Sequence, residues 1–132
     1  MNSSRENYLQ VIHRFVEEKG YATNKEISQF FEISKSSVSE MIKKLKEEGY
    51  LKVERNKISL SEMGELKAED ILSARRLWEY FLSEHLGMDS EEMHRQADLL
   101  EHVASEELVE RLNKYLNYPK ECPCGKIIYK NK

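Results

Sequence analysis

The sequence predicts a mainly α-helical chain with one β-hairpin, followed by a second part that is entirely helical. Apolar residues recur at helical spacing along most of the 132 residues. One stretch, residues 51–60, instead alternates apolar and polar residues as strands do. Hydrophobic residues make up 39% and charged residues 34%, a balance typical of a folded, helix-rich chain and not of a disordered one.

A first helix is predicted from Ser3 to about Lys19. Ser3 and Glu6 have the spacing of a capping box, and Gly20 follows as a stop signal. Its inward face is predicted to consist of Tyr8, Ile12, Phe15 and Val16.

Two shorter helices follow, separated by a turn at residues 32–34. Thr23 and Glu26 form a second capping box, Ser34 is placed to cap the third helix, and Gly49 ends it. The inward residues of these helices are predicted to be Ile27, Phe30, Phe31, Val38, Met41, Ile42 and Leu45.

The hairpin is predicted from strands at residues 51–53 and 58–60, with Arg55-Asn-Lys57 as the turn between them. The order helix, helix, turn, helix, hairpin is that of a winged helix-turn-helix. We therefore expect residues 1–61 to form a DNA-binding domain of this type.

Helical spacing then resumes. A long helix is predicted up to Gly87, then a helix capped by Asp89, then one capped by Ser105. We expect residues 62–118 to form an all-α domain and residues 119–132 to form a short tail. Apolar positions of the three helices include Met63, Leu66, Leu77, Phe81, Met93, Ala97, Leu108, Val109 and Tyr115.

These helices have more apolar surface than some 70 residues cover alone, which indicates a homodimer. Candidate buried positions include Ile71, Trp78, Leu112 and Leu116.

The distribution of charge favours a nucleic-acid partner although the net charge is −3. Residues 35–57 contain seven Lys or Arg and four Glu, a local charge of +3, so the rest of the chain carries −6. Attraction to phosphates is local, because salt screens it over about 10 Å. A basic segment can therefore bind DNA within an acidic chain.

The residues expected to contact double-stranded DNA lie on the third helix and the hairpin tip. Small hydroxyls let a helix lie close to the major groove, and basic side chains suit phosphates. On the helix they are Ser34, Lys35, Ser36, Ser37, Ser39, Glu40, Lys43 and Lys44. At the tip, Arg55 and Lys57 are placed to contact the backbone or the minor groove.

Four potential metal ligands lie along one side of the predicted helix after Asp89. His94, Asp98, Glu101 and His102 are spaced i, i+4, i+7 and i+8. Imidazoles and carboxylates together suit Mn²⁺, Fe²⁺ or Zn²⁺.

Several motifs together resemble the diphtheria-toxin-repressor family of iron- and manganese-dependent repressors, over roughly residues 4–120. They are Tyr8-Leu-Gln-Val-Ile, Glu18-Lys-Gly-Tyr-Ala, Ser36-Ser-Val-Ser-Glu-Met-Ile-Lys-Lys-Leu, Gly49-Tyr-Leu, Leu60-Ser-Glu-Met-Gly and Leu100-Glu-His-Val. The short length is similar to the manganese-type branch. The resemblance implies a dimer that binds a palindromic operator with Fe²⁺ or Mn²⁺ as co-repressor.

The resemblance assigns metal-ligand positions to Asp98, Glu101 and His102, and ancillary-site positions to His94 and Glu79. It also shows departures. Asn7 and Gln10 stand where the family has stronger ligands, and Arg75 stands where it has a histidine. Arginine stays protonated and cannot bind a metal.

Two hypotheses follow from these departures. In the first, a metal still binds through Asp98, Glu101 and His102, aided by His94 or Glu79. In the second, the Arg75 guanidinium pairs with Asp98 or Glu101 and takes the place of the cation, so that the regulator is metal-independent or responds to another signal.

Cys122 and Cys124 form a close thiol pair after the last helix. Two thiolates alone make a poor metal site, which usually needs four ligands. Two tails meeting across a dimer axis could hold zinc or an iron–sulfur cluster. Each tail could instead join a histidine or carboxylate of its own subunit, have a redox role, or be disordered with inert thiols.

The sequence favours a DNA-binding transcriptional regulator that is not an enzyme. No HExxH motif, glycine-rich phosphate loop or nucleophile triad supports a metallohydrolase, the enzymatic alternative. A protein-interaction module without DNA binding is a further alternative. No apolar run reaches the roughly 20 residues that cross a bilayer, and no signal peptide is apparent, so a cytoplasmic location with reduced cysteines is expected.

Overall fold

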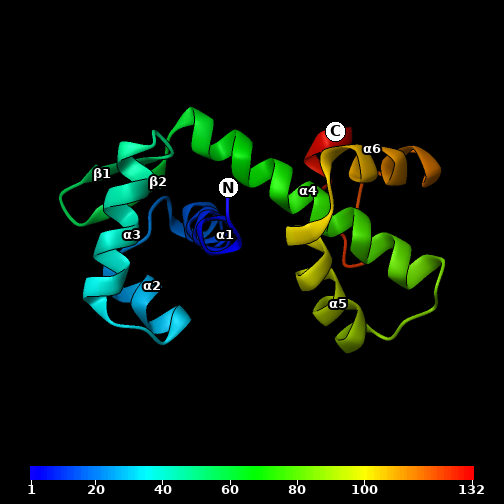
Figure 1. Cartoon of the computed structure of the whole chain (residues 1–132), viewed down its shortest axis with the longest axis horizontal. Coiled ribbons are helices and arrows are strands. Elements are labelled where there is room, and N and C mark those ends of the chain that lie inside the picture. The colour runs from blue at the N-terminus through cyan, green and yellow to red at the C-terminus, as the bar shows by residue number, and fades with distance from the viewer. The chain divides into compact units, whose positions relative to one another are not determined.

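The computed structural model describes all 132 residues, as two compact units, Met1–Ala68 and Glu69–Lys132 (Figure 1). The first unit contains α1 (Ser3–Lys19), α2 (Asn24–Phe31), α3 (Lys35–Glu47), β1 (Leu51–Glu54), β2 (Lys57–Leu60) and the start of α4 (Glu62–Glu84). The second unit contains the rest of α4, α5 (Ser90–Val103), α6 (Glu106–Tyr115) and a short 3₁₀ helix, η1 (Tyr129–Asn131). The predicted fold class is confirmed: the chain is mainly helical, with a two-stranded antiparallel wing after the third helix. No helix combines the length and apolar character needed to cross a membrane.

Side-chain caps place most helix starts where the sequence predicts them. Thr23 forms a complete capping box with Glu26, and the Ser34 and Ser105 side chains accept hydrogen bonds from the first turns of α3 and α6. The prediction for α1 is wrong by one residue, because Asn2 and not Ser3 is the N-cap and accepts a 2.9 Å bond from the backbone N–H of Arg5. Asn caps a helix as well as Ser does, so the neighbouring positions compete.

The wing is held to the first unit by backbone pairing. Leu51 pairs with Leu60 in the antiparallel register, and Ile58 also exchanges two backbone hydrogen bonds with Ala22, at 2.7 and 2.8 Å. The turn is shorter than predicted, since Lys57 is the first residue of β2. Arg55 lies in the turn with φ of 59°, in the left-handed region that favours glycine.

Buried side chains of the first three helices form the core of the first unit. Leu9, Ile12, Ile27, Val38 and Leu45 are fully buried. Phe30, predicted to point inward, is instead largely exposed, and so are Met63 and Leu66, two apolar positions at the start of α4. Phe30 packs edge-on against Phe31, whose ring in turn contacts the buried Tyr8 in a tilted arrangement, so Phe31 is the inward member of that aromatic pair.

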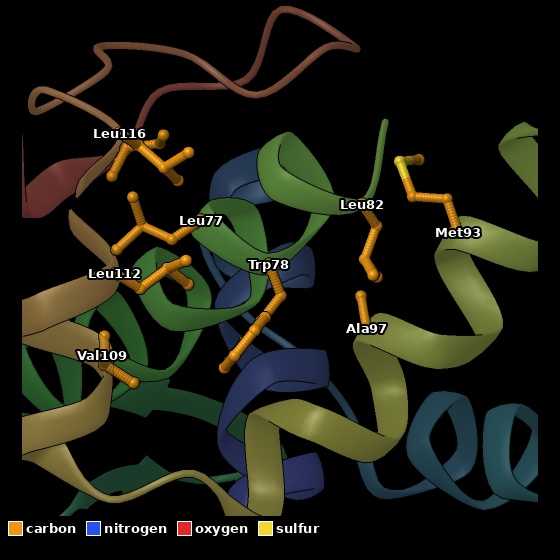
Figure 2. Close-up of a cluster of buried hydrophobic side chains, with 9 residues drawn as sticks. Leu77, Trp78, Leu82, Met93, Ala97, Val109, Leu112 and Leu116 are labelled. Carbon is orange, nitrogen blue, oxygen red and sulfur yellow. The ribbon is translucent and has the colours of Figure 1, made fainter. Parts of the chain in front are cut away.

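In the second unit, side chains from α4, α5 and α6 converge on one apolar cluster (Figure 2). Its members are Leu77, Trp78, Leu82, Met93, Ala97, Val109, Leu112, Leu116 and Ile128. The four positions predicted to be buried in the helical domain, Ile71, Trp78, Leu112 and Leu116, are therefore covered within a single chain. Leu108 and Tyr115, two of the apolar positions of α6, are exposed.

The residues after α6 fold back onto the second unit. Ile128 is fully buried in the apolar cluster, and the backbone N–H of Lys130 donates to Ser73 Oγ of α4 at 3.1 Å. Arg76 of α4 donates to the carbonyl of Ile127 at 2.6 Å. A reciprocal pair of amide hydrogen bonds, at 2.9 and 2.7 Å, joins Asn131 to Asn113 of α6. The tail is thus an ordered part of this unit, and the alternative of a disordered tail is wrong.

Candidate functional site

The third helix presents a polar face outward because its apolar residues are buried. Val38, Ile42 and Leu45 lie in the core of the first unit and fix the rotation of α3. All ten residues predicted to contact DNA are exposed: Ser34, Lys35, Ser36, Ser37, Ser39, Glu40, Lys43, Lys44, Arg55 and Lys57.

The serines at the start of α3 are linked by hydrogen bonds. Ser34 Oγ accepts from the backbone N–H of Ser37 at 3.1 Å and donates to Ser37 Oγ at 2.9 Å. Ser39 Oγ accepts a 2.8 Å bond from the Asn24 side chain, which also donates to the carbonyl of Lys35. Sequence reasoning missed Asn24, which ties the start of α2 to α3.

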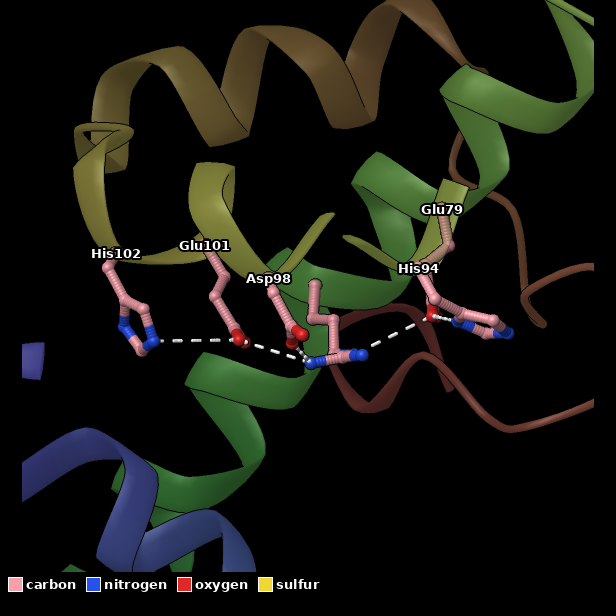
Figure 3. A network of polar contacts seen from close by, with 6 residues as sticks. Glu79, His94, Asp98, Glu101 and His102 are labelled. Atoms are coloured by element: carbon pink, nitrogen blue, oxygen red, sulfur yellow. Dashed lines mark hydrogen bonds and ion pairs between the residues drawn. The ribbon is translucent and has the colours of Figure 1, made fainter. Parts of the chain in front are cut away.

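The polar residues of α4 and α5 form one network centred on Arg75 (Figure 3). Its Nη1 donates to Asp98 Oδ1 and, at 3.2 Å, to Glu101 Oε1. Its Nε lies 3.6 Å from Glu79 Oε2, one turn along α4. The predicted pairing of Arg75 with Asp98 or Glu101 is confirmed, and it involves both carboxylates.

Two histidines flank this network. His94 Nδ1 lies 2.8 Å from Glu79 Oε2, and His102 Nε2 lies 3.6 Å from Glu101 Oε1. The Glu79 and Glu101 side chains are only 5% and 1% exposed, whereas that of Asp98 is 58% exposed. The buried carboxylates therefore depend on protein partners, and Asp98 is also solvated.

Burial and charge oppose each other at Arg75. Burial by itself lowers the pKa of an arginine, but the charges of Glu101, Asp98 and Glu79 outweigh it and hold the pKa of Arg75 above its ordinary value. The guanidinium is thus a permanent positive charge among these carboxylates. It lies between side chains that the sequence assigned to a metal.

A second group of potential ligands lies beside Glu79. One carboxylate oxygen of Glu79 and the thiol sulfurs of Cys122 and Cys124 lie within 4.8 Å of one another. No other three His, Cys, Asp or Glu side chains meet in this way. Of the arrangements that the sequence left open for the cysteines, the fold brings them to a carboxylate of their own chain.

A tight turn places both thiols beside Glu79. The backbone N–H of Gly125 donates to the carbonyl of Cys122 at 2.9 Å, and Gly125 adopts φ of 84°, which glycine accommodates without steric cost. Cys122 is buried and Cys124 is exposed. Burial, reinforced by the hydrogen bond to Cys124, raises the pKa of the Cys122 thiol.

Two protein-family models match nearly the whole chain. The N-terminal DNA binding domain of the iron dependent repressors matches residues 1–58. Their metal binding and dimerisation domain matches residues 61–130.

Individual relatives agree with this match. An uncharacterised helix-turn-helix transcriptional regulator of Methanocaldococcus jannaschii is 35% identical over 88% of this chain and 94% of its own length. The transcriptional regulator MntR of Oceanobacillus iheyensis is 30% identical over 89% of this chain and 80% of its own length. The crystal structure of ScaR with bound Zn²⁺ superposes with a TM-score of 0.86 and is 39% identical. The alignment covers 94% of this chain but only 58% of ScaR, so the chain spans little more than half of that protein.

Proposed function

Because this chain belongs to the family of iron-dependent repressors, we propose that it is a dimeric, metal-responsive, DNA-binding regulator of transcription acting in the cytoplasm. The observation that carries the metal-responsive part is the convergence of Glu79, Cys122 and Cys124. It lies inside the segment that matches the family's metal binding domain.

The DNA-binding role is proposed for α3 and the wing. Buried apolar residues hold α3, and its exposed face carries hydroxyls and the basic residues Lys43 and Lys44. Hydroxyls bond base edges or phosphates, and lysines neutralise phosphates. We assign sequence reading to Ser37 and Glu40, and phosphate contact to Lys43, Lys44 and Arg55.

The proposed operator is palindromic, because a two-fold dimer presents two identical α3 helices to two half-sites. The domain that matches residues 61–130 is a dimerisation domain in the family. In this chain its surface retains large exposed apolar side chains that one protomer does not cover: Leu99, Val103, Leu108, Tyr115 and Tyr118. Such a surface supports association of two copies.

The proposed metal centre consists of Glu79, Cys122 and Cys124. The donor set fits a divalent transition metal, because two sulfurs and one oxygen lie close enough to share one ion; water or another ligand would have to complete the coordination. Thiolates favour Fe²⁺ and Zn²⁺ over Mn²⁺, which prefers oxygen donors. A bound ion would be held by Glu79 of α4 together with the two thiols of the tail.

The residues around this centre are suited to holding the ligands in place. His94 contacts Glu79 at 2.8 Å, and a hydrogen bond of this kind commonly fixes the orientation of a carboxylate that binds a metal. The hydrogen bonds from Arg76 to Ile127 and from Lys130 to Ser73 hold the tail that carries both thiols. Metal binding needs both thiols deprotonated. The raised pKa of Cys122 makes deprotonation of that thiol less favourable and so weakens metal binding.

Elemental analysis of anaerobically purified protein tests the proposal first. An operator selected from random duplexes is then titrated with protein, by fluorescence anisotropy, with the metal found and with a chelator. We expect metal to tighten or release binding to the selected palindrome, and C122S/C124S and Glu79→Gln to abolish that response. Glu84→Gln, an exposed carboxylate further along α4, is the matched control and keeps it.

Two results contradict this function. If DNA affinity is the same with metal and chelator, the protein is a metal-independent regulator. If no duplex is selected, the chain is an interaction module that does not bind DNA.

A further inference from the structure

The Arg75 guanidinium lies where three carboxylates face one another. Glu101 and Asp98 of α5 contact its Nη1, and Glu79 of its own helix lies 3.6 Å from its Nε. Two of the three carboxylates are almost completely buried. Buried carboxylates need a cation or several hydrogen-bond donors, because burial removes the water that stabilises their charge.

A divalent metal is one way to supply that charge, and an arginine is another. The guanidinium is planar, stays protonated and offers several donors at once, so one side chain can bond two carboxylates. Arg75 does this for Asp98 and Glu101 from a single nitrogen. These carboxylates are two of the three residues that the sequence assigned as principal ligands. The third, His102, lies 3.6 Å from Glu101 and does not close a group of three ligands with them.

We propose that Arg75 is the built-in cation of the Asp98–Glu101 pair, and that this pair consequently binds no divalent metal. A metal at the same position would have to displace the guanidinium from two carboxylates and would then lie beside its positive charge. Two positive groups a few ångströms apart repel each other strongly at the low effective dielectric of a protein. The inference does not rest on the proposed function, since it concerns a different set of ligands from Cys122 and Cys124.

The test removes the thiol centre first, so that only the Arg75 cluster is measured. C122S/C124S protein is titrated with Mn²⁺, and bound metal is counted from the loss of the free-Mn²⁺ paramagnetic resonance signal. We expect no stoichiometric binding. In the same background, Arg75→His exposes the carboxylates and adds an imidazole, and we expect it to gain one Mn²⁺ per chain, with affinity higher on the order of 100-fold or more.

Two matched variants separate the loss of the guanidinium from the gain of a histidine. Arg95→His adds an imidazole to α5 but leaves Arg75 in place, because Arg95 is exposed and pairs with Glu92. Arg75→Lys keeps the positive charge. Neither should gain metal.

The inference is overturned if C122S/C124S protein with Arg75 intact binds Mn²⁺ stoichiometrically and Asp98→Asn or Glu101→Gln abolishes that binding. It is also overturned if folded Arg75→His protein gains no metal. The first comparison needs no substitution at Arg75, so the test stands even where Arg75→His does not fold. Failure of the thiol centre to bind metal contradicts the proposed function and leaves this inference untouched.

Discussion

Replacing Arg75 with methionine should strongly destabilise the protein, although the two side chains are similar in length. The substitution removes the guanidinium from Glu101 and Glu79, which are 1% and 5% exposed and keep their contacts with His102 and His94. Removing one partner of a buried ion pair costs about 3–5 kcal/mol, because the remaining charge stays buried and uncompensated.

The lower end of that range applies here. Arg75 is itself 23% exposed, and Glu79 keeps its contact with His94 at 2.8 Å. The contact with Asp98 adds little, since exposed ion pairs contribute about 0–1 kcal/mol. We therefore expect the free energy of unfolding to fall by about 3 kcal/mol at neutral pH.

Urea unfolding followed by circular dichroism, with a chelator present, measures this loss. Glu101→Gln in the Arg75→Met background should recover part of the loss, as coupled residues do. Arg95→Met is the control, because its side chain is 72% exposed, and it should change stability by no more than about 0.5 kcal/mol. If Arg75→Met unfolds at the same urea concentration as Arg95→Met, the buried carboxylates do not depend on Arg75.

Three further predictions concern the first unit. Gly64→Ala should lower the free energy of unfolding by about 1–3 kcal/mol or more, because an added Cβ would lie 2.0 Å from the Tyr50 carbonyl oxygen. Urea titration measures this loss, and an unchanged midpoint would show that the backbone shifts without cost to accommodate the Cβ. Arg55→Gly should leave folding intact, because glycine adopts φ of 59° without cost, yet weaken DNA binding and reduce the salt slope by about one unit; an unchanged slope in anisotropy titrations would remove the wing from the phosphate contacts. The hydrogen bond from Lys19 lowers the pKa of Glu26, so its ionised form stabilises the fold above the ordinary glutamate pKa, and that contribution is lost as pH falls through the lowered value. Glu26→Gln should accordingly cost about 1 kcal/mol or less at neutral pH, and this cost should fall as the pH drops below the ordinary glutamate pKa; a cost that stays the same would point to the capping geometry instead of the charge.

Glu79 belongs to both polar centres of the second unit. Its Oε2 contacts His94 at 2.8 Å and lies 3.6 Å from Arg75, and its carboxylate also approaches the two thiols. Of the three carboxylates around Arg75, it has the longest contact with the guanidinium. Glu79 is therefore the carboxylate best placed to bind a metal together with the two thiols, while Asp98 and Glu101 remain paired with Arg75.

Local signals in the sequence determined the succession of helices and the wing. Capping at Thr23 and Ser34, the stop at Gly20 and the alternation before Leu60 act over a few residues, so a sequence displays them directly. The exposure of the eight predicted DNA contacts at α3 follows from the same periodicity, because the apolar residues of α3 fix its rotation. Where two signals competed at adjacent positions, as at Asn2 and Ser3, the predicted N-cap was wrong by one residue.

The tertiary structure decided between the alternatives that the sequence left open for the polar groups. The pairing of Arg75 with Asp98 or Glu101 was one of two hypotheses, and the crossing of α4 and α5 brings Arg75 against both carboxylates. The tail folds back onto α4 through two hydrogen bonds, from Arg76 to Ile127 and from Lys130 to Ser73. The residues that each bond joins are 51 and 57 positions apart in the sequence. No local propensity encodes such contacts, since they arise from burial of Ile128 in a cluster shared by three helices. That packing places Cys122 and Cys124 beside Glu79, so the sequence supplies the ligands and the tertiary fold selects which of them share a site.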